Sequence, residues 1–276
     1  MSVVTHIKSK PLKPGKERTN LSPFLNSIHQ TELPMLEFDR MGKLPVFYYD
    51  NTSITAAFTA STKAVKALLP DPDMRPVELF PGRTVVTFSC FEYRDTDIDP
   101  YNELGIGFLI SYGKKRLPGL PLLKGLISKQ FEAFVWQLPV TTEIARWGGV
   151  ELYGFPKFIA DIDFARHDKT TSIRLAVDGN HILTLEGKNL KTGSNASNLR
   201  YGAYSTMNGI SLCANVYTHP LAYAQTLMPN AATLELGTHP IADALRKLKL
   251  SKRPVMYQYC PQNELVLFGP RNLMDN

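Results

Sequence analysis

One lysine in the sequence has apolar neighbours. Lys157 lies in the stretch ELYGFPKF, residues 151–158, directly after Pro156 and directly before Phe158. Pro156 fixes φ and so sets the direction of the chain just before the lysine. If Phe155 and Phe158 shield the amine from water, burial favours its neutral form. A neutral amine can attack a ketone to form a Schiff base, and the protonated imine stabilises the carbanion left by loss of CO2 or of a proton.

A structural role for Lys157 stays open beside this chemistry. In an alternating strand the lysine would share a face with Asp161 and Asp163. Its ammonium group could then reach solvent next to these carboxylates, which is the usual arrangement for a lysine.

A glutamate with space beside it is the second candidate. The segment 101–112, YNELGIGFLISY, alternates as a strand does. Its two faces carry Leu104, Ile106, Phe108 and Ile110 on one side and Glu103, Gly105, Gly107 and Leu109 on the other. Glu103 therefore shares its face with two residues that lack a side chain, which leaves space for a substrate, although glycines also occur where a strand bends.

Sequence patterns for other common sites are absent. The chain has no Gly-x-x-x-x-Gly-Lys-Ser/Thr loop and no Gly-x-Ser-x-Gly elbow, and GIGFLI lacks the third glycine of a dinucleotide fingerprint. The six histidines form no close metal-ligand pair. The three cysteines, Cys90, Cys213 and Cys260, are far apart and odd in number, so we expect reduced thiols of a cytoplasmic protein. We expect neither a metal nor a cofactor.

Charge and composition narrow the possible partners. The chain has 276 residues, of which 43% are hydrophobic, as in globular proteins. Its net charge of +6 is uneven, because residues 1–20 carry five positive charges against one negative. A basic tail can contact nucleic acid or an anionic membrane, but no downstream segment interleaves basic and aromatic residues. With no apolar run long enough to span a bilayer, we expect neither a nucleic-acid nor a membrane partner.

The pattern along the chain predicts one β-rich domain with a few short helices. Residues 1–33 indicate a basic arm with little order, and residues 34–276 the domain, since no linker divides them. Helices are predicted over 61–70 and 239–250 from apolar spacing. Strands are predicted over 44–50, 54–60, 83–95, 101–112, 172–177, 181–187, 254–259 and 264–269. An Asp-Gly pair at 178–179 predicts a hairpin.

Three stretches resemble the acetoacetate decarboxylase family. ELYGFPKF is similar to its active-site signature, whose Schiff-base lysine corresponds to Lys157. DPYNELGIGF is similar to a Tyr-x-Glu strand whose glutamate enters the active site, here Glu103. LPVFYYDNTSITAAF followed by AVKALLP is similar to the family's N-terminal strand–helix unit, and the similarity runs from Pro34 to Gly269. The resemblance implies a single-domain antiparallel β-barrel (α+β, mainly β) that holds both residues in its lumen, works without a cofactor and forms a homo-oligomer.

The sequence also departs from the family's pattern. Decarboxylases of the family carry a second lysine where this chain has Phe158, and an upstream glutamate whose position corresponds to Ser89. Arg40 corresponds to a family arginine that could hold a carboxylate. Glu151 shares the lysine motif, and Tyr257 lies in a late strand where family barrels close. We therefore treat Arg40, Glu151, Tyr257 and Phe158 as weaker substrate-binding candidates beside Lys157 and Glu103.

The resulting prediction is a Schiff-base lyase that acts on a small keto acid. Decarboxylation of a β-keto acid and aldol or dehydration chemistry on a pyruvate-like substrate are both compatible with it. The departures at Phe158 and Ser89 predict little decarboxylation of acetoacetate. A non-catalytic barrel that binds a small apolar ligand, with a structural Lys157, is the alternative.

Overall fold

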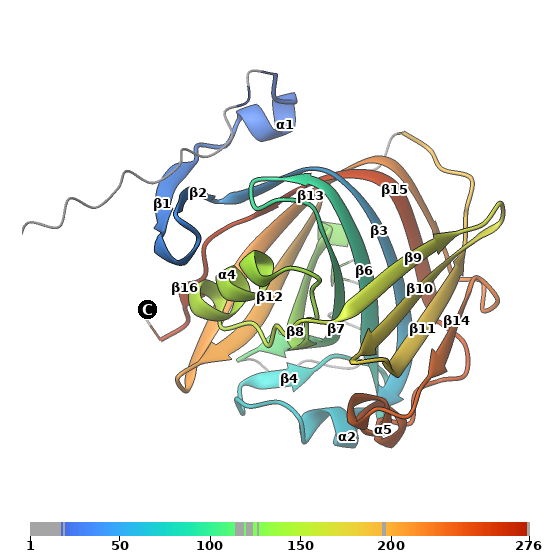
Figure 1. Ribbon diagram of the computed structural model, residues 1–276. Coiled ribbons are helices and arrows are strands. Elements are labelled where there is room, and N and C mark those ends of the chain that lie inside the picture. Colours follow the sequence, from blue (N-terminus) through green and yellow to red (C-terminus); the bar gives the residue numbers. More distant parts are fainter. Residues whose placement is uncertain are drawn as a thin grey trace, which may run out of the picture.

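A closed barrel forms the centre of the computed structural model, which describes residues 18, 20–113, 119, 124–125, 127–194 and 197–274 (Figure 1). In ring order its strands are β7 (Tyr101–Tyr112), β8 (Gln130–Gln137), β12 (Leu199–Met207), β13 (Ile210–Thr226), β15 (Met256–Leu267), β3 (Val46–Ser61) and β6 (Arg83–Thr96). Pairing of β6 with β7 completes the ring. The neighbours pair antiparallel except β8 and β12, which are parallel. The predicted mainly antiparallel barrel is confirmed.

Two pairs of predicted strands are each one long strand. The segments 44–50 and 54–60 join in β3, and 254–259 and 264–269 join in β15. The register shifts where the predicted strands were separated, for example between Cys260 and Asn263 of β15. Irregularities of this kind bend a strand without ending it, so the polar residues and the proline between the segments mark bends and not turns.

A second sheet packs outside the barrel. Its order is β14 (Ala232–Leu236), β11 (Asn180–Lys188), β10 (Thr170–Val177) and β9 (Asp161–Arg166). Asp178 and Gly179 join β10 to β11 with φ of 49° and 77°, which are the positive values that a two-residue hairpin turn requires. The predicted Asp-Gly hairpin is confirmed.

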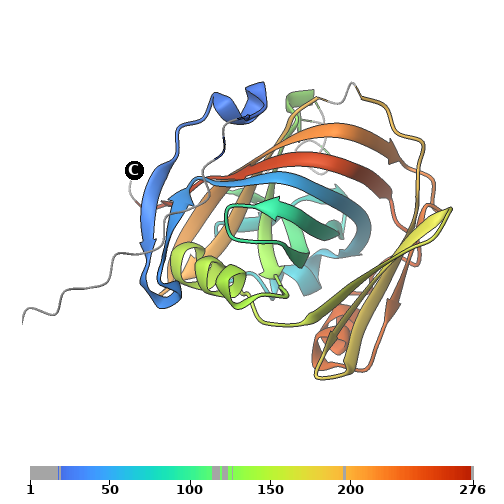
Figure 2. The same ribbon diagram turned by 45° about the horizontal axis from the view of Figure 1, so that its top comes forward.

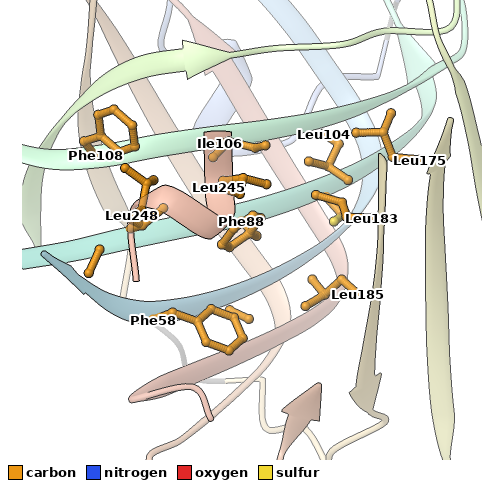
Figure 3. Packing of buried hydrophobic residues seen from close by; sticks show 14 of the residues in the cluster. Phe58, Phe88, Leu104, Ile106, Phe108, Leu175, Leu183, Leu185, Leu245 and Leu248 are labelled. Atoms are coloured by element: carbon orange, nitrogen blue, oxygen red, sulfur yellow. The ribbon is translucent and has the colours of Figure 1, made fainter. Parts of the chain in front are cut away.

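The main hydrophobic core lies between the barrel's outer face and this second sheet (Figure 3). The side chains that meet there include Phe58, Phe88, Leu104, Ile106 and Phe108 from the barrel, Leu175, Leu183 and Leu185 from the sheet, and Leu245 and Leu248 from the region of α5 (Pro240–Lys247). Because successive residues of a strand point to opposite sides, the barrel strands that bury one face in this core turn their other face to the lumen. The core thus leaves the lumen available for a site.

The remaining elements lie outside the seven-stranded ring. They are α1 (Pro23–Asn26), β1 (Thr31–Met35), η1 (Leu36–Phe38), β2 (Arg40–Leu44), α2 (Thr62–Lys66), β4 (Met74–Pro76), β5 (Glu78–Phe80), α4 (Glu143–Tyr153) and β16 (Arg271–Asn272). The predicted helices over 61–70 and 239–250 are α2 and α5, and Ser61 caps α2 as its Oγ accepts from the Ala64 N–H. The β1–β2 hairpin and α4 lie side by side at one end of the barrel, as Figure 2 shows. Within the described residues, no helix combines the length and apolar character that crossing a bilayer requires.

The N-terminal arm differs in part from its prediction. Residues 1–17 and 19 lie outside the described residues, whereas α1 and the start of β1 fall within the predicted arm of 1–33. Leu25 of α1 is buried against Phe47 and Val266 of the barrel. Leu21, Phe24 and Ile28 pack against the same cluster. These apolar contacts hold a segment whose composition by itself indicates an arm.

Candidate active site

The chain turns sharply at Gly154, three residues before Lys157. Gly154 ends α4 with a φ of +60°, and its N–H donates to the carbonyl of Val150 at 3.1 Å. A Cβ at this position would lie 2.8 Å from the Cβ of Met207 in β12. Both the positive φ and the close approach of the two backbones therefore require glycine here.

Backbone hydrogen bonds hold the segment that follows the turn. The Leu138 N–H donates to the carbonyl of Pro156 at 3.3 Å, and the Val140 N–H donates to the carbonyl of Phe158 at 2.9 Å. These bonds stand on both sides of Lys157 and join its segment to the chain that leaves β8. The position of the lysine is thus set by the barrel wall, and Pro156 needs no hydrogen-bond donor there.

The side chain of Lys157 is almost completely buried, with 5% of it exposed. Its stem crosses α4 at Gly149, where an added Cβ would lie only 2.2 Å from Cδ and 2.5 Å from Cε of the lysine. The missing side chain at Gly149 therefore provides the channel through which the amine reaches the lumen. The sequence analysis did not identify Gly149 as a site residue. Two adjacent glycines, Gly148 and Gly149, in the middle of a helix were the available signal, because glycine destabilises a helix interior.

Lys157 and Glu103 form a buried ion pair. The Nζ atom of Lys157 donates to Oε2 of Glu103 at 2.7 Å, and the Glu103 side chain is 9% exposed. Tyr93 donates its hydroxyl to Oε1 of the same carboxylate at 3.2 Å. Buried charges persist only when they are paired and hydrogen-bonded, so these contacts hold the amine and the carboxylate at fixed positions. A solvent-facing lysine beside Asp161 and Asp163 is not what the structure contains.

Three tyrosines surround the carboxylate. Tyr48, Tyr93 and Tyr101 are buried, and the hydroxyls of Tyr48 and Tyr101 lie 3.1 Å apart. The Tyr101 ring centroid lies 5.5 Å from Nζ of Lys157. Burial, followed by the charge of Glu103, raises the pKa of each phenol well above its ordinary value. These hydroxyls therefore stay protonated and act as donors or dipoles, not as bases.

The pair opens into a cavity of about 210 Å³ in the barrel lumen. Apolar side chains form most of its wall, among them Phe91, Leu138, Phe155, Val216 and Leu265. Gly105 and Gly107 line it on the same strand as Glu103, which agrees with the space predicted beside the carboxylate. Of the described residues that line the cavity, only Lys157 and Glu103 are charged.

Two weaker candidates lie on the core side of the barrel wall. Phe158 packs against the outer hydrophobic core, and its neighbour Phe155 lines the cavity. Tyr257 is buried in the same core and donates its hydroxyl to the Lys188 carbonyl at 3.0 Å, whereas Gln258 faces the lumen. Neither side chain is among the described residues that line the cavity. For Tyr257 the sequence could not decide this, because alternation by itself does not say which parity of a strand points inward.

The other two weaker candidates lie away from the cavity. The guanidinium of Arg40 in β2 donates to Asp99 at 2.6 Å and to the Asp97 carbonyl at 2.9 Å. These bonds hold the guanidinium at the turn between β6 and β7, and Arg40 is not among the described residues that line the lumen. Glu151 lies on an exposed position of α4. The Ser89 position does face the cavity, where its Oγ accepts from Thr55 Oγ1 at 3.0 Å.

The described residues offer no alternative metal chemistry. Among them, no three His, Cys, Asp or Glu side chains come together in a way that could hold a metal ion. Cys90, Cys213 and Cys260 are buried free thiols.

The fold and the site together define a closed β-barrel with a lysine–glutamate pair in its lumen. Residues 34–271 match the family model described as acetoacetate decarboxylase (ADC), so the chain belongs to the acetoacetate decarboxylase family. The resemblance seen in the sequence is confirmed by this match. No curated protein matches the chain in sequence.

Solved structures share the fold at low sequence identity. Acetoacetate decarboxylase from Legionella pneumophila is 17% identical with a TM-score of 0.59, over 83% of this chain and 87% of that one. The enduracididine biosynthesis enzyme MppR in complex with pyruvate is 11% identical with a TM-score of 0.61, over 83% and 90%. An acetoacetate decarboxylase-like enzyme from Sphingomonas wittichii RW1 is 14% identical with a TM-score of 0.51, over 83% and 92%. These similarities show the fold alone.

Proposed function

We propose that this protein is a Schiff-base lyase acting on a keto acid, with Lys157 as the nucleophile and Glu103 as the proton carrier. The observation that carries the proposal is the contact of 2.7 Å between Nζ of Lys157 and Glu103 inside a mostly apolar lumen. Membership of the acetoacetate decarboxylase family supports a lyase of this type.

The pair can generate its own nucleophile. Transfer of one proton from the ammonium group to the carboxylate gives a neutral amine and a neutral acid without changing the net charge of the lumen. The two groups are already in hydrogen-bond contact, so this transfer needs no further base. The amine then attacks the carbonyl carbon of the substrate, the acid returns a proton to the departing oxygen, and water leaves as the protonated imine forms.

The imine can serve two reactions. In a β-keto acid the electrons of the bond to the carboxylate move into the imine and CO2 leaves. Glu103, which has given up its proton during imine formation, takes up another from solvent and delivers it to the resulting enamine. In a pyruvate-like acid Glu103 removes a proton from the carbon next to the imine, and the enamine attacks an aldehyde. A structure of MppR with a condensation product of pyruvate and an aldehyde supports including this second route.

We propose that acetoacetate is decarboxylated slowly. Phe158 occupies the position of the family's second lysine, and Ser89 that of its upstream glutamate. A second ammonium group near Lys157 would favour the neutral amine, and the described lining of the cavity contains none. The mostly apolar wall also favours the alternative, a non-catalytic barrel that binds an apolar ligand.

Covalent trapping tests the proposal. Incubation with pyruvate or acetoacetate and borohydride should add the mass of the reduced ligand at Lys157, as mass spectrometry of the digested protein would show. Lys157→Ala should lose the label, and Lys129→Ala, which removes an exposed lysine, should keep it. Labelling that persists in Lys157→Ala would place the reactive amine elsewhere, and absence of any adduct would favour the binding barrel. Release of CO2 from acetoacetate distinguishes decarboxylation from the aldol route.

The cellular compartment and the oligomeric state of the protein are also proposals. We propose a cytoplasmic homo-oligomer. The three buried thiols, which form no disulfide, are compatible with a reducing compartment. Light scattering of the purified protein would give the oligomeric state.

A further inference from the structure

The lumen is much longer than a three- or four-carbon acid. Glu103 and Leu109 of β7 both line the cavity and are six residues apart, which corresponds to about 20 Å of strand. The cavity volume of about 210 Å³ compares with about 10–15 Å³ by the same measure for one water molecule. A small keto acid bound at Lys157 would leave most of this space unfilled.

None of the described residues that line the lumen beyond the pair is charged. Of the described lining residues, those farther along β7 than Glu103 are Gly105, Ile106, Gly107 and Leu109. The facing strands add Ala133, Val135, Leu199, Tyr201 and Ala203. A carboxylate or an amine placed among these groups would lose its hydration without gaining a partner.

Three of the neutral polar side chains beyond Glu103 take part in hydrogen bonds within the barrel wall. Thr55 Oγ1 donates to Ser89 Oγ at 3.0 Å, and Thr87 Oγ1 donates to the Gly107 carbonyl at 3.4 Å. These side chains already have hydrogen-bond partners, so they do not call for a polar ligand. The lumen beyond Glu103 therefore favours hydrocarbon.

We propose that the substrate is a keto acid with an extended apolar tail of about five or more carbon atoms, which lies along β6 and β7 beyond Glu103. This assignment rests on the proposed Schiff-base function. The carbonyl carbon meets Nζ of Lys157, and the tail passes Gly105, where the lack of a side chain widens the channel. The Ser89–Gly105 pair of β6 and β7 lies two residues beyond Glu103, about 7 Å along the strand, and the tail must cross it.

A chain-length series of probes tests this substrate class. Straight-chain 2-oxo acids of three, six and eight carbons are each trapped with borohydride, and the half-saturating concentration for adduct formation at Lys157 is measured by mass spectrometry. Burial of a methylene group strengthens binding about fourfold. The eight-carbon acid should therefore bind at least about thirtyfold more tightly than pyruvate, even when only half of the added methylenes are buried.

Narrowing the channel should remove this gain. Ser89→Leu fills the lumen beyond Glu103 and should reduce the thirtyfold preference to less than about fivefold, and Gly105→Ala, whose Cβ would lie 3.2 Å from Leu138, tests the same point if the first variant does not fold. Thr233→Leu on an exposed position of β14 is the matched control and should keep the preference.

The outcomes separate the two proposals. No adduct with any acid would refute the Schiff-base function, and the substrate class with it. Adducts whose affinity is flat or falls with chain length would refute the apolar tail alone. A preference for the long acid that survives both channel variants would place the tail outside this lumen and overturn the assignment.

Discussion

Gly149→Ala is the substitution that tests most directly how the fold delivers the amine. The added Cβ would lie 2.2 Å from Cδ of Lys157, whereas ordinary contact begins at 3.4 Å. The lysine stem must therefore move by at least 1.2 Å, the difference of these two distances. Because Nζ lies at the end of that stem, its contact of 2.7 Å with Glu103 is lost or distorted.

The size of the effect follows from this displacement. A misplacement of about 1 Å in a reacting group can cost about 100-fold in rate, so we expect the rate of imine formation in Gly149→Ala to fall by about that factor. The fold should survive, because alanine is favoured over glycine in a helix by about 1 kcal/mol and the clash falls on a flexible side chain. The loss should therefore be one of reactivity and not of folded protein.

The neighbouring glycine provides the control. An added Cβ at Gly148 meets nothing within 4 Å, so Gly148→Ala should keep full reactivity and gain up to about 1 kcal/mol of stability. The assay is the rate of borohydride-trapped adduct formation, with urea unfolding measured in parallel. Equal rates in the two variants would mean that the stem does not pass Gly149 as the structure shows.

A double-mutant cycle isolates the contact itself. In a Lys157→Ala background the stem is absent, so Gly149→Ala should become as stabilising as Gly148→Ala. The difference in the free-energy effect of Gly149→Ala between the two backgrounds should be about 0.5–3 kcal/mol, as for residues in direct contact. A difference near zero would contradict the predicted clash.

Two further predictions concern the carboxylate and the buried thiol. Glu103→Gln keeps the shape but not the proton transfer, so the adduct at Lys157 should still form but more slowly, while turnover falls by about 100-fold or more; unchanged turnover would make Glu103 structural. Burial raises the pKa of the Cys90 thiol above its ordinary value of 9.0. Above pH 9.0 the unfolded chain therefore loses a proton that the folded protein keeps. The contribution of the thiol to stability is complete below pH 9.0, and above it the free energy of unfolding falls by up to about 1.4 kcal/mol per pH unit. Urea unfolding between pH 8 and 10 should show a shallower loss of stability in Cys90→Ala than in the original protein, and identical slopes would mean that Cys90 ionises in the folded state.

Local patterns were sufficient for most of the secondary structure. The alternation of 101–112, the Asp-Gly turn at 178–179 and the apolar spacing of 239–250 each depend on near neighbours, and each predicted element is present as β7, the β10–β11 hairpin and α5. The separation of 44–50 from 54–60 was wrong because pairing with β6 and β15 carries the strand through its irregular residues. Hydrogen bonds from both neighbours outweigh a locally unfavourable sequence.

In the candidate site, too, local motifs identified residues, whereas the fold determined the contacts between them. The motif pointed to Lys157 and Glu103, but the contact between them joins residues 54 positions apart. Tyr48 and Tyr93 complete the surroundings of the carboxylate. Tyr93 belongs to no recognised motif, and Tyr48 lies in the stretch similar to the family's N-terminal strand–helix unit, where nothing marks it as a site residue. Their approach to Glu103 follows from the pairing of β6 with β7 and of β3 with β6, and pairing of distant strands is not encoded in any short stretch.

The sequence by itself determined which residues can do chemistry and on which strands or turns they lie, because residue type and short-range periodicity are local properties. Only the tertiary structure decided which face of each strand turns inward, because both faces of the barrel wall carry apolar residues. One of these faces is buried under the second sheet and the other lines the lumen. Tyr257 and Gln258 are adjacent in sequence and equally suited to a strand, yet closure of the barrel and packing of the second sheet place one in the core and the other in the cavity.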